Sequence, residues 1–112
     1  MFKVVVSDLD GTLLNGQHQI SSRTRDTLHR LVEQGVKFVV ATGRHHVDVR
    51  SFRDALGMDI YLITSNGAVV HDKQDQLIFN QPLPTEIAAE LIALERDPSI
   101  HLNVYQGDDW VV

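Results

Sequence analysis

Short uninterrupted apolar runs alternate with stretches of helical spacing along the first half of the chain. Residues 3–8, 36–41 and 60–63 are rich in Val and Ile and show no polar alternation. Runs of this kind are typical of strands that are buried on both faces of a parallel sheet. The pattern therefore predicts three buried strands.

Two helices are predicted between these strands. In the first, Leu28, Leu31 and Val32 share one face, and in the second Val49, Phe52 and Leu56 do so. Ser21 or Ser22 is the expected cap of the first helix. Gly35 and Gly57 are the expected ends of the two helices, because glycine readily adopts the left-handed conformation that follows a helix.

The order strand, helix, strand, helix, strand predicts an α/β fold, the first half of a doubly wound, Rossmann-like parallel sheet. In such sheets the ligand crevice lies beyond the carboxyl ends of the strands. The three strands exit into polar, glycine-containing loops, which begin at Asp8, at Thr42 and at Thr64. We expect these loops to converge on one edge of the sheet and to form a site there.

The chain changes character after residue 68. Residues 69–71 and 77–79 flank a polar turn and predict an antiparallel hairpin. Pro82 and Pro84 mark a boundary, so we predict a core over 1–82 and the beginning of a second domain over 83–112. That second part should contain a helix from a cap at Thr85 to about residue 94, and strands at 101–105 and 110–112.

Composition narrows the function classes. The 112 residues are 43% hydrophobic, carry a formal net charge of −5 and include no cysteine. The acidic balance and the lack of a basic cluster disfavour a nucleic-acid partner. The only N-terminal apolar run is too short for a signal peptide or a membrane span. We therefore expect a cytoplasmic protein with no membrane partner.

The segment that follows the first strand carries the candidate chemistry. Asp8 is placed to attack phosphorus as a carboxylate nucleophile, and Asp10 to act as general acid and base. Mg²⁺ bound by Asp8 and by the main-chain carbonyl of Asp10 would offset the repulsion between carboxylate and phosphate. Leu9, Gly11 and Thr12 complete the predicted phosphate-binding segment, to which Gly11 gives accessible amides and Thr12 a hydroxyl.

Three motifs in order, Asp-Leu-Asp-Gly-Thr-Leu at 8–13, Ala-Thr-Gly-Arg at 41–44 and Ser-Asn-Gly-Ala at 65–68, resemble the haloacid dehalogenase superfamily. The similarity is to its sugar-phosphatase-like branch with a large inserted α/β cap. It implies a Mg²⁺-dependent phosphomonoester hydrolase that acts on small phosphorylated metabolites through a phosphoaspartate. The residues that follow Arg44 further resemble bacterial members that act on pyridoxal phosphate and small sugar phosphates.

The resemblance also assigns residues in the later loops. Thr42 would bind the transferring phosphoryl group through its hydroxyl, while Gly43, Asn66 and Gly67 would shape the pocket. For Arg44 two roles stay open, a phosphate contact or an ion pair that ties the second helix to a carboxylate near the site. Asn66 is as readily explained as a turn residue before glycine.

Family members also use a lysine and a later acidic pair, neither of which we find in the sequence. Lys3 should lie about 16 Å from Asp8, at the opposite edge of the sheet, so it cannot be the lysine that neutralises the nucleophile and phosphate. Lys37 is excluded for the same reason. We interpret Gly107-Asp108-Asp109 as a turn. The expectation is an N-terminal fragment that is inactive or nearly so by itself.

Three alternatives stay open. A phosphomutase would transfer phosphate between sugar positions rather than release it. A non-catalytic remnant would act as a binding or oligomerisation module and associate with itself through unpaired sheet edges. A response-regulator-like receiver domain is disfavoured, because its acceptor Asp is expected at a central strand and not at the first.

Overall fold

The computed structural model describes residues 1–111, which form two compact units. The first is Met1–Asn80 and the second is Gln81–Val112, of which Val112 lies outside the described residues. Their assignment as a core and the start of a cap stays a prediction.

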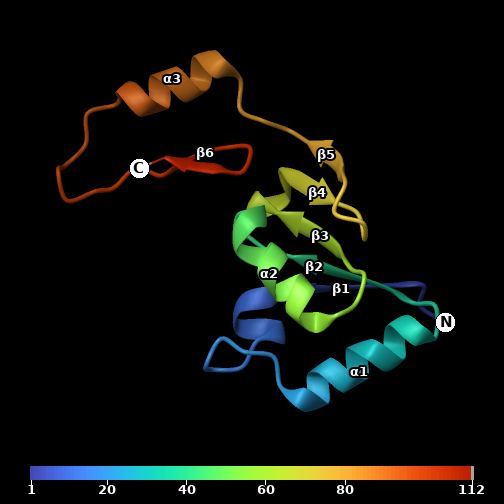
Figure 1. The fold of residues 1–112 in the computed structure, drawn as a ribbon. Coiled ribbons are helices and arrows are strands. Elements are labelled where there is room, and N and C mark those ends of the chain that lie inside the picture. The colour runs from blue at the N-terminus through green and yellow to red at the C-terminus, as the bar shows by residue number, and fades with distance from the viewer. Residues whose placement is uncertain (112) are drawn as a thin grey trace. The chain divides into compact units, whose positions relative to one another are not determined.

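The first unit is built on one five-stranded sheet (Figure 1). Its strands, in spatial as well as chain order, are β1 (Val4–Asp8), β2 (Lys37–Ala41), β3 (Tyr61–Thr64), β4 (Val69–His71) and β5 (Leu77–Asn80). The first three are parallel, and the predicted hairpin β4–β5 continues the sheet through antiparallel pairing of β4 with β3. The α/β class is confirmed, although the sheet is mixed rather than wholly parallel.

Both predicted helices of the first unit are present. Helix α1 (Ser22–Glu33) is capped by Ser21, whose hydroxyl accepts a hydrogen bond from the Thr24 amide at 3.2 Å. Helix α2 (His46–Leu56) ends at Gly57, which adopts φ 67° as the sequence predicted. Such left-handed residues let the last carbonyls of a helix find partners, and few side chains tolerate that conformation.

The helices pack on the sheet around one core, whose buried members are Leu9, Leu14, Leu28, Phe38, Val40, Val49, Leu56, Ile60 and Leu62. The first strand departs from its predicted burial on both faces. Val5 packs against the core, but Val4 and Val6, which point to the opposite face by strand alternation, are 47% and 56% exposed. Within residues 1–111 this part of the second face is uncovered, so the prediction of two-sided burial is wrong for β1.

The second unit contains α3 (Thr85–Ala93) and a hairpin of β6 (Val104–Gln106) and β7 (Asp109–Val111). Thr85 is the first helical residue and Pro84 occupies the cap position, so the predicted Thr85 cap is wrong. The strand predicted at 101–105 is found as the shorter β6, which begins at Val104 and ends at Gln106. The strand predicted at 110–112 overlaps β7, and its last residue lies outside the described residues. No helix in residues 1–111 has the length and apolar run that crossing a membrane requires.

Candidate active site

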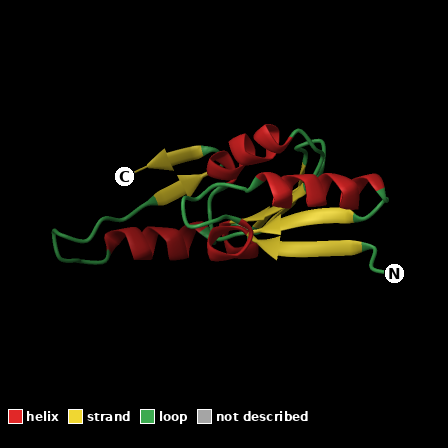
Figure 2. Cartoon of the chain, turned by 90° about the horizontal axis from the view of Figure 1, so that it is seen from below, coloured by secondary structure: helices red, strands yellow, loops and turns green. Residues whose placement is uncertain are grey.

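Strand register brings the three predicted loops to one edge of the first unit's sheet. Asp8 at the end of β1 pairs with Ala41 at the end of β2, and Ala41 in turn pairs with Ile63 in β3. The N-terminus lies at the other end of these strands, away from their arrowheads (Figure 2). The chain segments that follow β1, β2 and β3 therefore leave the sheet together, as the sequence predicted.

The loop after β1 is a short, irregular turn, Leu9–Leu13, that Asp8 caps. The Asp8 carboxylate accepts a hydrogen bond from the Leu9 amide at 2.8 Å and lies 3.5 Å from the Thr12 hydroxyl. The turn reverses at Gly11, where φ is 71°. The Leu9 side chain is buried in the core, so only its backbone is available to a ligand. Asp8 itself is exposed and open to one.

Asp10 is held by Arg44 from the second loop. The guanidinium donates from Nε to Oδ2 of Asp10 at 2.7 Å and from Nη2 to Oδ1 at 2.5 Å. Bidentate pairs of this kind are among the stronger ion pairs in proteins. Both side chains are partly exposed, at 38% for Arg44 and 43% for Asp10. Of the two roles left open for Arg44, the structure shows the tie to a carboxylate.

This pairing sets the protonation of Asp10. The hydrogen bonds from Arg44 lower the pKa of Asp10 below its ordinary value, and His18, 3.8 Å away, acts in the same direction. Asp10 in return raises the pKa of Arg44. The arrangement favours the carboxylate form of Asp10. A second negative charge beside Asp10, such as that of a phosphate, would raise the pKa of Asp10 and so oppose the effect of Arg44. The protonated form of Asp10 would then be easier to reach.

The second and third loops are bound to each other. The Thr42 hydroxyl accepts from the Arg44 amide at 3.1 Å, and the Ser65 amide donates to the Arg44 carbonyl at 2.8 Å. Ser65 and Asn66 both have left-handed backbones, with φ of 50° and 56°. Consecutive non-glycine residues in this region store strain and cluster at functional sites.

Glycine at position 43 has a steric reason. A Cβ atom at Gly43 would lie 2.7 Å from Oδ1 of Asn66, closer than van der Waals contact permits. The Asn66 side chain therefore packs directly on the backbone of the second loop. Gly67, with φ 95°, completes the third turn. Gly43 and Asn66 are both predicted site residues, but their contact could not be predicted, because no sequence pattern links position 43 to position 66.

The donors at this edge suit a hard cation. The Asp8 carboxylate and the Asp10 carbonyl are oxygen ligands of the type that Mg²⁺ prefers, and Mg²⁺ commonly keeps several waters with one or two protein ligands. The set therefore fits the predicted ion. Its occupation by Mg²⁺ stays a prediction.

A second polar cluster lies beside α2 and was not predicted. His46, His71 and Asp75 place one ligand atom each within 4.8 Å of one another. The two imidazole rings are stacked, with centroids 3.6 Å apart and planes 12° from parallel. A metal bound to an imidazole lies in the plane of the ring, and nearly parallel stacked planes share no such point. We therefore interpret this cluster as an ion-pair network, which Arg53 completes through a 2.7 Å contact with Asp75.

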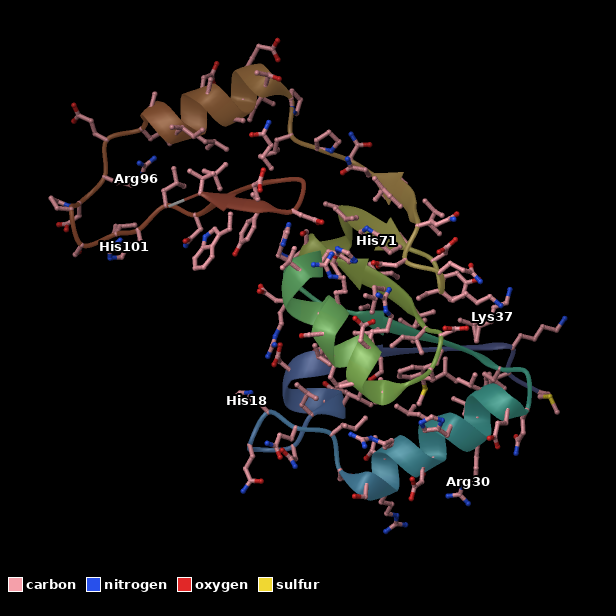
Figure 3. All side chains as sticks on the ribbon, viewed as in Figure 1. His18, Arg30, Lys37, His71, Arg96 and His101 are labelled. Atoms are coloured by element: carbon pink, nitrogen blue, oxygen red, sulfur yellow. The ribbon has the colours of Figure 1, made fainter. Side chains whose placement is uncertain are left out.

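The lysines lie where the sequence placed them. The Lys37 amide donates to the Lys3 carbonyl at 2.9 Å, at the start of β1 and β2 and so at the edge opposite to Asp8. Figure 3 shows Lys37 and His18 at opposite ends of the first unit. Lys73 belongs to the turn between β4 and β5. The first unit thus brings the aspartates and later loops together without a lysine from these three positions.

A family model for haloacid dehalogenase-like hydrolases matches residues 5–112, nearly the whole chain. The chain belongs to this family. A Haemophilus influenzae relative that carries a provisional phosphatase name is 43% identical over 111 residues, covering 97% of this chain and 41% of its own length. The HMP-PP phosphatase of Shigella flexneri is 34% identical over 110 residues, covering 98% of this chain and 40% of its own length.

Solved structures agree with this assignment. A haloacid dehalogenase-like hydrolase from B. subtilis superposes with a TM-score of 0.78 at 37% identity, over 82% of this chain and 32% of its own. One from Bacteroides thetaiotaomicron gives 0.76 at 33%, over 82% and 36%. The chain spans about two fifths of the length of the curated relatives it matches. Fold and family are thereby confirmed for this haloacid dehalogenase-like chain.

Proposed function

We propose that the whole protein is a Mg²⁺-dependent phosphomonoester hydrolase in which Asp8 becomes transiently phosphorylated. The observation that carries the proposal is the exposed Asp8 carboxylate at the end of β1, with Asp10, Thr42 and Asn66 delivered to the same sheet edge by the register of β1, β2 and β3. Relatives named as phosphatases support the reaction class. The name HMP-PP phosphatase supports a small phosphorylated metabolite as substrate.

In this mechanism one oxygen of Asp8 attacks phosphorus while the bond from phosphorus to the leaving oxygen breaks. Oδ1 of Asp8 is held by the Leu9 amide, so we assign the attack to Oδ2, whose contact with Thr12 is long. Asp10 gives a proton to the leaving oxygen and then takes one from the water that hydrolyses the phosphoaspartate. Bound Mg²⁺ would supply neutralisation of the negative charge that gathers between carboxylate and phosphate.

The test is phosphate release from an aryl phosphate ester by the whole protein and by the 112-residue chain, with Mg²⁺ and with a chelator. We expect turnover by the whole protein that needs Mg²⁺ and falls at least a thousandfold in Asp8→Asn, because the nucleophile is removed. Asp26→Asn, an exposed change on α1, is the matched control and should keep full activity. Full activity of Asp8→Asn would refute the proposal.

For the 112-residue chain alone we expect little or no turnover. Within residues 1–111, neither Lys3, Lys37 nor Lys73 lies at the edge of the sheet that holds Asp8. Stabilisation of transition-state charge supplies most of the acceleration in phosphoryl transfer. Robust turnover by the purified chain that disappears in Asp8→Asn would contradict this expectation while supporting the proposed reaction.

A further inference from the structure

Arg44 connects all three loops of the candidate site. Its amide is bound by the Thr42 hydroxyl in the second loop, and its carbonyl accepts from Ser65 in the third. Its guanidinium crosses to Asp10 in the first loop, 34 positions away in the sequence. The backbone of Arg44 is therefore held by hydrogen bonds that do not involve its guanidinium, which is the group that binds Asp10.

The backbone of the first loop holds the Asp10 side chain less firmly than a regular helix would, so the contact with Arg44 matters more there. The turn Leu9–Leu13 is closed by the Leu14 amide on the Leu9 carbonyl at 3.0 Å, but Asp10 and Gly11 inside it have non-helical backbones. Asp10 is exposed, so packing does not fix its side chain. Within residues 1–111, the Asp10 carboxylate is bound by the Arg44 guanidinium and lies 3.8 Å from His18.

The geometry also limits what else Arg44 can bind. A guanidinium carries five N–H donors in a planar fork, and a bidentate partner takes one edge of it. Asp10 occupies the edge formed by Nε and Nη2. A phosphate could then approach only the remaining donors, and it could not take the same bidentate edge without displacing Asp10.

Resting on the proposed function, we propose that Arg44 is a positioning residue that acts through Asp10 and is not a ligand of the transferring phosphate. It holds the Asp10 carboxylate in one orientation at the sheet edge and ties the Leu9–Leu13 turn to the two later loops. Its loss leaves the substrate phosphate bound but leaves Asp10 free to turn away from the leaving oxygen. Misplacement of a catalytic group by about 1 Å can slow a reaction about a hundredfold.

The experiment compares Arg44→Lys with wild type in the whole protein. Lysine keeps the positive charge but cannot make the two parallel hydrogen bonds. We expect kcat to fall by about tenfold to a hundredfold while KM stays within about threefold. Arg30→Lys, an exposed substitution on α1 (Figure 3), is the matched control and should leave both unchanged. A rise in KM of tenfold or more at unchanged kcat would overturn the proposal, because it would make Arg44 a substrate ligand.

A double substitution tests whether the effect travels through Asp10. In an Asp10→Asn background, Arg44→Lys should cause no further loss of kcat, because residues that act through one another are non-additive. A further loss equal to that in the wild-type background would overturn the proposal.

Binding of inorganic phosphate, measured by calorimetry with Mg²⁺, gives a readout that needs no turnover. Arg44→Lys should bind phosphate within about threefold of wild type, and a tenfold loss would overturn the proposal. A wild-type protein that neither binds phosphate nor hydrolyses esters would show instead that the proposed function has failed. Wild-type activity with unaltered kcat in Arg44→Lys would refute the positioning role alone.

Discussion

Asp75→Asn should destabilise the first unit by removing one charge from a partly buried network. Asp75 Oδ1 lies 2.7 Å from Nη1 of Arg53 and 2.7 Å from Nε2 of His46. The Arg53 side chain is 9% exposed and the Asp75 side chain 30%. Asp75 also has φ 64°, a conformation that asparagine tolerates well, so the substitution changes charge without adding backbone strain.

The pKa of Asp75 gives the size of the effect. The hydrogen bond from Arg53, helped by His46, lowers this pKa from 3.8 to about 2. One pKa unit corresponds to about 1.4 kcal/mol, so the ionised form stabilises the fold by about 2.5 kcal/mol, which we reduce to about 2 kcal/mol for partial exposure. Asparagine keeps an oxygen that can accept, but it leaves the buried guanidinium of Arg53 without the facing carboxylate.

Urea unfolding followed by circular dichroism measures this loss as a function of pH. Because the folded-state pKa is depressed, the stabilisation is complete above pH 3.8 and is lost as the pH falls through about 2. The difference between wild type and Asp75→Asn should therefore be about 2 kcal/mol at pH 5 and about 0.5 kcal/mol or less at pH 2.

Asp72→Asn, in the same turn, is the matched control. Oδ1 of Asp72 accepts from the amides of Gln74 and Gln76 at 2.9 Å each, and an asparagine oxygen can do the same. The change should shift stability by less than about 0.5 kcal/mol. A difference between wild type and Asp75→Asn that is equal at pH 5 and pH 2 would refute the ion-pair account, and so would an equally large effect of Asp72→Asn.

Two further substitutions test the site and the core. Gly43→Ala should displace the Asn66 side chain, because its Cβ would lie 2.7 Å from Oδ1, and should weaken binding of inorganic phosphate severalfold in calorimetry. Gly16→Ala is the matched control and should leave phosphate binding unchanged, because a Cβ at this position would meet no atom within 4 Å. Equal phosphate affinity in wild type, Gly43→Ala and Gly16→Ala would contradict a role for the contact between Gly43 and Asn66. Thr64→Val should stabilise the fold by about 1 kcal/mol in urea unfolding, because the fully buried Thr64 hydroxyl has no hydrogen-bond partner among the described residues. A loss of stability would show that this hydroxyl is satisfied.

The first unit was largely predictable because its signals are local. A serine cap, a glycine end and a one-faced apolar stripe each act within a few residues, and they placed α1 and α2 correctly. The pairing of β4 with β3 was not predicted, because antiparallel addition of a hairpin to a parallel sheet depends on contacts between strands rather than on either strand's pattern. The Thr85 cap failed because Pro84 already supplies an extended residue before the helix.

The same difference between local signals and contacts distant in sequence applies to the candidate site. Asp8, Thr42 and Asn66 could be placed from sequence, since each lies at or just after the end of a strand and parallel strands bring their ends to one edge. The bidentate grip of Arg44 on Asp10 was one of two roles left open, because side-chain direction across 34 positions is fixed only by the folded loops. The roles of these residues in binding and catalysis stay predictions.

The first strand, β1, has an apolar sequence but is exposed on one face. Residues 4–6 are all valine, and parallel strands that read this way are normally covered on both faces. In residues 1–111 only the face of Val5 is covered, while Val4 and Val6 are exposed and β1 has a partner along one edge alone. Composition and burial therefore disagree at this strand. Cover for the second face would reconcile them. Self-association through the open edge stays a prediction, and it would pair the backbone of β1 rather than cover this face.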